Sequence, residues 1–344
     1  MQISQTIQVS VTGTITNVNH LKDVSILVTC FNKAPFIESF REQLESIKTY
    51  APEIIIVDDS SKDGSREKLT ALTKDISHIT LILNEENYGS ARSRNKAMHY
   101  ATRNWIFFWD IDDRVNFEVL NDMVEQAQLQ GVDLCKGNYS ILPSEGPTPE
   151  TILKDTLSAF PISDFATSIV EEMGYWRFLY SRRFLEENKI IFAPPSMHSN
   201  SRSFILDDVF YLIFVAAANG HISFSHEQQP VYIYSPTFHS DTTWENFQRQ
   251  AAIFSKASLN CIQYAKDIGS LNNDLVYELI LRKAITHMQY LNFFHWANSI
   301  VDFIRLIFIT ENSMRLTSKL ALVERTLMRS IKNSIASKLH KTSS

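Results

Sequence analysis

The chain has few cysteines and few glycines for its 344 residues. Its three cysteines, Cys30, Cys135 and Cys261, lie far apart, which argues against a disulfide framework or a zinc site and fits a reducing compartment. None of its nine glycines builds a phosphate loop of the G-x-x-x-x-G-K-S/T type. The G-x-G-x-x-G fingerprint is also missing, which excludes a dinucleotide-dependent oxidoreductase.

Long apolar runs are missing as well. No segment reaches the roughly 18 uninterrupted apolar residues of a spanning helix, and Asp302 and Arg305 interrupt the nearest one, Trp296 to Ile309. Residues 1–20 lack the charged start and apolar core of a signal peptide. The formal net charge of -5 gives no general attraction to nucleic acid. We therefore expect a cytoplasmic protein, at most peripheral at the inner face of the cell membrane, with no nucleic-acid partner.

What the chain does contain is a repeated strand–helix pattern in a globular composition. Hydrophobic residues make up 44% and charged residues 21%, which is typical of a protein with a large core. From Val24 onward, apolar runs of strand length alternate with helical segments, and this predicts a mostly parallel sheet with helices on both faces. The expected strands cover 24–29, 54–57, 79–83, 105–109 and 132–136. One helix is expected to begin after residue 32, a second near residue 62, and two more cover 90–102 and 117–130.

The regular alternation ends near Pro143, in a loop rich in proline, glycine and serine. From Trp244 onward no strand pattern remains, and residues 244–340 have the pattern of three or four helices. We therefore place a domain boundary near residue 242. Between these points we expect three helices: one near 163–172, one that begins after a cap at Ser181 and one at 207–218. We also expect strands at 221–225 and 231–234.

Two of the expected strands end in clustered carboxylates. The pair Asp58–Asp59 follows the second strand, and Asp110, Asp112 and Asp113 follow the fourth. Ligands of open α/β sheets bind at the carboxyl ends of strands, where carboxylates can hold a divalent cation and, through it, phosphates. This pattern predicts a nucleotide and a metal ion side by side. The plainer alternatives are a solvated turn for the first pair and an acidic helix start for the second cluster, although a helix start explains only one of its acids.

Residues 24 to about 240 resemble the family 2 glycosyltransferases, which have the GT-A fold. The resemblance rests on five elements in the order in which the family has them. They are the V-P-x-Y-N-like segment at 28–32, the V-D-D-x-S turn at 57–61, the N-x-G-x-x-x-x-R-N element at 87–95, the D-x-D-D motif at 110–113 and the W-x-x-L-Y-x-R-x-F-L-E-x-N-x-I-x-F signature at 176–192.

This resemblance implies an α/β domain of the Rossmann-like GT-A fold, with a mostly parallel sheet between helices, and a C-terminal all-helical module. The implied division is an N-terminal arm at 1–23, the GT-A domain at 24–242 with a nucleotide-binding half at 24–138 and an acceptor half at 139–242, and the helical module at 243–344.

The same resemblance assigns the donor to the first half of the domain. The implied donor-binding residues are Thr29, Phe31 and Asn32 against the nucleotide, Asp58 or Asp59 at its base and ribose, Gly89, Arg94 and Asn95 at the sugar diphosphate, and Asp110 and Ile111 at the ribose or donor sugar. Thr29 stands where the family usually has proline. Taken alone, Arg94 could equally be a solvated arginine at a helix start, although arginine suits a diphosphate.

Metal and catalytic residues are also implied by the resemblance. Asp112 would bind Mg²⁺ or Mn²⁺, a cation that helps the nucleoside diphosphate to leave. His239, in a late H-S element, could be a third metal ligand or contact the diphosphate, although a lone loop histidine is more often structural or exposed. Asp208 is the candidate base for an inverting transfer, and Asp207 stands where the family usually has glutamate. Either could be the base, and both fit the acidic start of helix 207–218 as well.

On the acceptor side the resemblance points to Trp176 and Asp113. Trp176 could stack on an acceptor sugar, with packing in the core as the alternative. Between residue 314 and the C-terminus the chain has seven Lys or Arg but a single acid, Glu324. Apolar residues recur every three or four positions in this segment. Such a basic amphipathic helix could lie on an anionic membrane that carries a lipid-linked glycan acceptor, pack on its neighbours or form a homo-oligomer contact.

The resemblance thus implies a metal-dependent inverting glycosyltransferase. It would move a sugar from a nucleotide sugar, expected to be UDP-linked, to a hydroxyl of a glycan in bacterial capsule, lipopolysaccharide or other surface polysaccharide synthesis. A sugar nucleotidyltransferase is one alternative, but it needs a glycine-rich loop near the N-terminus, and residues 29–36 contain no glycine. An inactive GT-A scaffold is the other, and the retained Asp112 and Asp208 oppose it.

Overall fold

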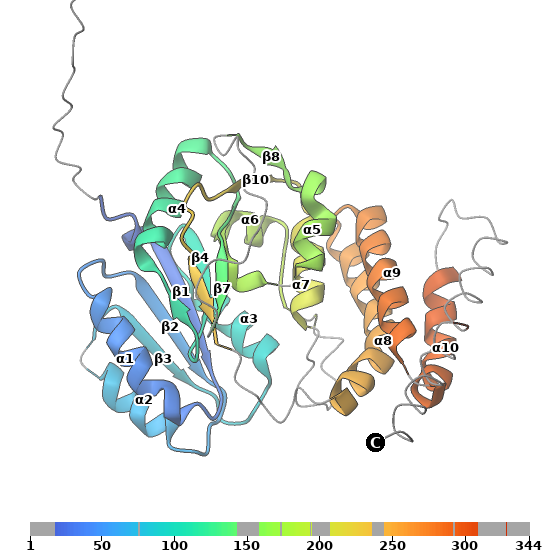
Figure 1. Ribbon diagram of the computed structural model, residues 1–344, viewed down its shortest axis with the longest axis horizontal. Helices are drawn as coiled ribbons and strands as arrows, with labels where there is room; N and C mark the ends of the chain where they lie inside the picture. Colours follow the sequence, from blue (N-terminus) through green and yellow to red (C-terminus); the bar gives the residue numbers. More distant parts are fainter. Residues whose placement is uncertain are drawn as a thin grey trace, which may run out of the picture.

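The computed structural model describes residues 18–74, 76–142, 158–172, 174–192, 194, 207–235, 244–291, 293–308 and 328. Through this part of the chain runs a sheet in the order β3-β2-β1-β4-β9-β6-β10-β8 (Figure 1). Its strands are β1 Val24–Cys30, β2 Glu53–Asp58, β3 Ile79–Leu83, β4 Trp105–Asp110, β6 Leu134–Lys136, β8 Phe160–Pro161, β9 Phe178–Ser181 and β10 His221–Phe224. The first four are parallel, β9 is antiparallel to both of its neighbours, and β8 is antiparallel to β10. The expected mostly parallel sheet is confirmed.

Helices cover both faces of this sheet. The helices are α1 Ile37–Ser46, α2 Ser65–Thr73 and α4 Phe117–Gln130 on one face, and α3 Ser90–Tyr100, α5 Ala166–Glu171, α6 Arg182–Glu187 and α7 Asp207–Ala217 on the other. Within β1, Ile26 and Val28 belong to the first hydrophobic layer and Leu27 to the second. Because side chains alternate along a strand and both layers are apolar, the strand reads as a continuous hydrophobic run.

The ends of several helices follow from local sequence. Asn116 precedes α4, and its side chain accepts a hydrogen bond from the Val119 N–H. The helix ends at Gly131, whose φ of 62° lies in the left-handed region that favours glycine. The expected cap at Ser181 is confirmed, because its side chain accepts from the Phe184 N–H at the start of α6.

A second, smaller sheet ties the D-x-D-D segment to the far half of the domain. Its order is β5-β11-β7, with β5 Arg114–Val115, β7 Tyr139–Ile141 and β11 Tyr232–Tyr234. Tyr232 pairs with Val115 on one side and with Tyr139 on the other. The residues just after Asp113 are therefore held by a strand that lies more than a hundred positions later in the chain.

The helices that follow residue 242 are α8 Trp244–Ile268, α9 Asn273–Tyr290 and α10 Phe293–Phe308. Figure 1 shows them side by side beyond α5 and α7, on the side of the molecule away from α1 and α2. The all-helical C-terminal region is confirmed within the described residues, and its apolar side chains share one cluster with those of α7. The division into separate domains stays a prediction. No helix in the described part of the chain combines the length and apolarity needed to cross a membrane.

A buried histidine makes the packing of these helices sensitive to acid. His287 of α9 is 7% exposed, and its ring lies 4.3 Å from that of Phe254 in α8. Phe254 in turn stacks on Phe210 of α7 at 4.9 Å. Burial, and after it the charge of Lys283, lowers the pKa of His287 from 6.5 to about 4.

We predict that His287 contributes an acid-labile part of the stability. Because its pKa is lower in the folded chain, only the unfolded chain takes up the proton between pH 6.5 and about 4, so the free energy of unfolding falls as the pH drops through this window. From pH 7 to pH 5 the loss due to this residue is about 2 kcal/mol. Urea denaturation at both pH values should show that His287→Phe loses less, whereas the exposed control His221→Gln behaves as the wild type. An equal loss in His287→Phe would contradict the prediction.

Candidate active site

The carboxyl ends of three neighbouring strands bring the predicted donor residues together. In the register of the sheet, Cys30 of β1 pairs with Asp58 of β2, and Thr29 of β1 pairs with Asp110 of β4. Parallel strands end at the same edge, so the loops after β1, β2 and β4 all meet there. The strand-end rule therefore places the two acidic clusters on either side of β1.

Asp110 lies at the centre of the contacts at this edge. Its Oδ1 accepts from Nη2 of Arg94 at 3.3 Å and from the hydroxyl of Thr29 at 3.4 Å. Its Oδ2 accepts from the hydroxyl of Tyr175 at 2.9 Å. Burial raises the pKa of Tyr175 well above its usual range, so this hydroxyl stays protonated and donates. The Arg94 guanidinium also lies over the Tyr175 ring, 4.5 Å from its centroid, which fixes the arginine at the site.

Asp113 is a buried anchor of the D-x-D-D loop. It accepts from the Tyr232 hydroxyl at 2.8 Å and from the Ser235 N–H at 2.7 Å, so it joins the loop to β11. Burial, and after it the negative charge of Asp110, raises the pKa of Asp113 to about 8. With an exposed fraction of 3% it offers little surface to an acceptor. Ile111 is equally buried, at 2%, and packs in the hydrophobic layer of α1 and α4.

Asp112, the predicted metal ligand, pairs with a lysine in the structure. Its side chain forms a salt bridge with Nζ of Lys33, from the loop after β1. Among the described residues no group of three or more His, Cys, Asp or Glu side chains forms a metal site. Mg²⁺ is commonly bound by one or two carboxylates together with substrate phosphates and water, and Asp112 next to Asp110 fits that kind of site. His239, the further predicted ligand, lies outside the described residues.

Asp58, the last residue of β2, and Asp59, directly after it, both bind groups of the neighbouring loops and helices. Asp58 is fully buried and forms a salt bridge with Nε of Arg66 at 3.3 Å. Asp59 accepts from the backbone N–H groups of Tyr88 and Gly89, at 2.9 and 2.7 Å, with Gly89 at a φ of 87°. Asp59 thereby fixes the turn that opens α3 and places Arg94 next to Asp110.

Asn32 and Asn95 also bind the protein backbone. The Asn32 side chain accepts from the Lys62 N–H at 2.8 Å, which joins the loops after β1 and β2. The Asn95 side chain donates to the Phe192 carbonyl and accepts from the Phe192 N–H, both at 2.8 Å. Phe31, in contrast, is 43% exposed at the same edge, so its predicted contact with the nucleotide stays a prediction.

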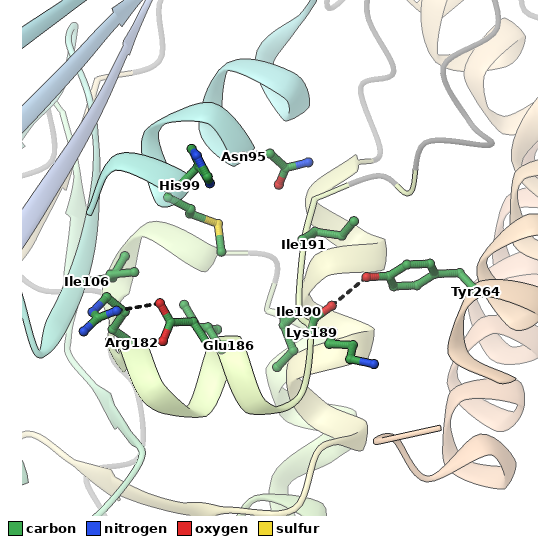
Figure 2. A pocket seen from close by; sticks show the side chains of 11 residues that line it. Asn95, His99, Ile106, Arg182, Glu186, Lys189, Ile190, Ile191 and Tyr264 are labelled. Atoms are coloured by element: carbon green, nitrogen blue, oxygen red, sulfur yellow. Dashed lines mark hydrogen bonds and ion pairs between the residues drawn. The ribbon is translucent and has the colours of Figure 1, made fainter. Parts of the chain in front are cut away.

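A pocket of about 350 Å³ lies on the flank of α3, with Asn95 at its border. Figure 2 shows the side chains of His99, Arg182, Glu186 and Tyr264 around it, from α3, α6 and α8. Its lining includes none of the carboxylates assigned to the donor, the metal or the base. This pocket is therefore distinct from the strand-end site.

Asp208, the candidate base, lies at the start of α7. Its Oδ1 accepts from the N–H of its neighbour Val209 at 2.8 Å, and its negative charge acts on both Tyr175 and Lys283. Tyr175 is itself bonded to Asp110, so the start of α7 faces the donor site. Lys283 comes from α9, and burial lowers the pKa of its ammonium while Glu171 and Asp208 oppose that shift. The side chain of Asp207 lies outside the described residues.

Trp176 is one member of an aromatic stack at the border of the site. Its ring stacks on Tyr232 at 4.3 Å and is nearly parallel to Tyr234 at 5.9 Å, with Tyr139 edge-on at 5.2 Å. Tyr234 remains 38% exposed. Partial burial is the main cause that raises its pKa, and the negative charges of the D-x-D-D acids add to it. The exposed member of the stack is therefore Tyr234.

Sequence reasoning did not assign roles to Lys33, Tyr175, Tyr232 or Tyr234. Tyr175 lies directly before Trp176, and Tyr232 and Tyr234 alternate in a strand pattern before the predicted H-S element. Their aromatic character was the only available signal, and it equally fits a core residue. Lys33 follows the V-P-x-Y-N-like segment and had no signal of its own.

Comparison with known proteins places the chain in a family. The model for glycosyl transferase family 2 matches residues 25–203, more than half of the chain, and the chain belongs to this family. The succinoglycan biosynthesis protein ExoO of Rhizobium meliloti is 26% identical over 183 residues, which cover 51% of this chain and 52% of ExoO. The glycosyltransferase GlyG of Streptococcus pneumoniae is 24% identical over 72% of this chain and 83% of GlyG. The chain spans about half the length of curated relatives such as ExoO.

Solved structures show the same fold. The structure of S. aureus TarS 1-349 in complex with UDP-GlcNAc aligns with a TM-score of 0.64 over 91% of this chain and 89% of that chain, at 19% sequence identity. This likeness confirms the GT-A fold, including the C-terminal helical region, and at this level of identity it shows the fold alone.

Proposed function

We propose that the protein is a metal-dependent inverting glycosyltransferase that moves a sugar from a UDP-sugar to a hydroxyl of a glycan acceptor. The observation that carries this proposal is the meeting of Arg94, Asp110 and Asp112 at the carboxyl ends of β1, β2 and β4, with the start of α7 facing them. A nucleotide sugar needs such an edge, with groups for the ribose, the diphosphate and a cation side by side.

In this proposal, different residues at the carboxyl edge of the sheet contact different parts of the donor. Phe31 covers the base, and Asp58 and Asp59 shape the nucleoside side of the strand-end site. Asp110 accepts from a ribose or sugar hydroxyl, and Arg94, which it holds in place, offers N–H groups to the diphosphate. Mg²⁺ or Mn²⁺ held by Asp112 would supply Lewis-acid neutralisation of the charge on the departing nucleoside diphosphate.

The acceptor enters between the start of α7 and the aromatic stack. Asp208 takes the proton of the acceptor hydroxyl while the oxygen bonds to the anomeric carbon and the bond from that carbon to the phosphate oxygen breaks. Attack from the face opposite the leaving group inverts the configuration. Tyr234, the exposed member of the stack, offers a flat apolar face to an acceptor sugar.

The cellular role is proposed from the relatives. ExoO is named for succinoglycan biosynthesis, and another relative, TuaG of Bacillus subtilis, is named as a putative teichuronic acid biosynthesis glycosyltransferase. We propose that this protein likewise acts on a bacterial surface polysaccharide or its lipid-linked precursor, at the cytoplasmic side of the membrane. The basic C-terminal helix that could contact the membrane, or a second copy of the chain, lies outside the described residues apart from Met328.

Thermal shift with a panel of UDP-, GDP-, CMP- and dTDP-sugars tests the donor. With Mn²⁺ present we expect a UDP-sugar to raise the melting temperature, because a ligand at 100 times its Kd adds about 2.7 kcal/mol to the stability of the folded state. Donor hydrolysis with Mn²⁺, lost in Asp112→Ala and kept in the exposed control Asp164→Ala, would distinguish an enzyme from an inactive scaffold. Preference for another nucleotide would overturn the donor assignment, and absence of turnover with every donor would overturn the enzyme.

A further inference from the structure

Lys33 binds the same carboxylate that the proposed function gives to a cation. Its Nζ forms a salt bridge with Oδ2 of Asp112, and both side chains are largely buried, with exposed fractions of 15% and 11%. Neither the sheet nor the donor roles above require a lysine at this position. Two positive charges that share one carboxylate repel each other, and the repulsion grows where water is excluded.

The loop that carries Lys33 is rigidly held. Asn32 has a φ of 52°, a left-handed conformation that costs energy in a non-glycine residue and persists where the surroundings enforce it. Three successive N–H groups of the loop donate to side chains of the turn after β2, namely Asn32 to Ser61 at 2.9 Å, Lys33 to Ser65 at 2.9 Å and Ala34 to Asp63 at 2.8 Å. The backbone of Lys33 is therefore fixed close to Asp112, whereas the backbone of a lysine in a loose surface loop would not be.

We propose that Lys33 makes cation binding at Asp112 depend on the diphosphate of the nucleotide. This inference rests on the proposed function, since it takes Asp112 as the cation ligand. A cation that reaches Asp112 alone meets the Lys33 ammonium next to it. When a diphosphate is present, the Lys33 ammonium pairs with it instead and leaves Asp112 to the cation, so the diphosphate removes the competition for Asp112. Nucleotide and cation then bind cooperatively, and by linkage the coupling is equal in both directions.

Removal of the ammonium has effects of opposite sign on the two ligands. Without Lys33 the cation alone should bind more tightly, because its competitor for Asp112 is gone. The nucleotide alone should bind more weakly, because its diphosphate loses a positive partner. A lysine that only supported the fold of the loop would instead weaken both ligands, so the two signs together identify the electrostatic role.

Titration calorimetry of the full chain with Mn²⁺ alone, UDP alone and UDP with Mn²⁺ tests the proposal. For Lys33→Met we expect Mn²⁺ alone to bind about tenfold more tightly and UDP alone to bind about tenfold more weakly. The coupling between them should fall by about tenfold, the factor by which Lys33 opposes the cation alone. Lys33→Arg keeps the charge and should restore the wild-type pattern. Lys62→Met removes an exposed charge from the neighbouring turn and serves as the control.

The outcomes separate this inference from the proposed function. Unchanged or weaker Mn²⁺ binding in Lys33→Met, or no Mn²⁺ binding to either protein up to millimolar concentration, would overturn the role of Lys33. If the wild type bound Mn²⁺ but UDP bound neither alone nor with Mn²⁺, the proposed donor would fail, and the Mn²⁺ titrations would still decide on Lys33. Matching circular dichroism spectra of the variants exclude a loss of folding as the cause.

Discussion

An Asp208→Asn variant is expected to transfer sugar on the order of 10²–10⁴-fold more slowly than the wild type, while it binds the donor equally well. The asparagine oxygen can still accept from the Val209 N–H, so the start of α7 keeps its hydrogen bond. What the variant loses is a group able to take the acceptor proton. Release of UDP from the donor, followed over time with a glycan acceptor or with water as the acceptor, measures this loss.

The neighbouring acid provides the sharpest comparison for this prediction. Asp207 occupies the first position of α7, and its replacement by asparagine removes the same charge without removing the proposed base. We expect Asp207→Asn to retain most of the turnover, and the exposed control Glu187→Gln to retain all of it. If Asp207→Asn were the inactive variant and Asp208→Asn the active one, the base would be Asp207.

In the proposed mechanism, Lys283 gives the C-terminal helices a part in the chemistry. The side chain belongs to α9, and its charge acts at the start of α7, close to Asp208 and Glu171. A nearby ammonium favours the ionised form of a carboxylate, which is the form that a base requires. The helical region packs against α7, and in the proposed mechanism it adds a positive charge next to the base.

Much of the fold follows from short-range sequence signals. Strand β4 covers Trp105–Asp110, one residue more than expected, because an apolar run buried on both faces has clear limits. Helix α4 matches its expected range, since both of its ends carry recognisable caps. Strand β9 was not predicted. Its four residues become a strand by pairing between β4 and β6, a contact with no local signal.

The sequence predicts where the acids of the candidate site lie along the strands better than it predicts which side chains they contact. The strand-end rule led to Asp110 and Asp112 because it depends only on where apolar runs stop. The contact from Tyr175 to Asp110 spans 65 positions, and the salt bridge from Lys33 to Asp112 spans 79. Sequence also does not reveal that Asn95 pairs with the backbone of Phe192, since an amide serves a ligand and a loop equally well.

An Arg177→Met variant is expected to lose about 3 kcal/mol of stability, because it breaks a buried ion-pair cluster. Arg177 is 1% exposed, and its Nε donates to the Gly137 carbonyl at 2.9 Å. Its Nη1 lies 3.3 Å from Glu172, which also binds Lys136, and its guanidinium lies over the ring of Tyr139. Methionine fills a similar volume but leaves the carbonyl and the carboxylate without this partner. Urea denaturation at pH 7 measures the loss.

The same variant should also disturb the active site, since Arg177 ends the short 3-10 helix Tyr175–Arg177. Tyr175 donates to Asp110, so loosening this helix weakens the support of the donor site as well as the fold. The matched control is Arg41→Met, whose exposed pair with Glu38 should contribute little, because solvent screens the two charges. Arg177→Lys keeps the charge but not the forked geometry, and we expect it to recover only part of the stability. A loss in Arg177→Met no larger than that in Arg41→Met would show that the buried cluster adds nothing to the stability.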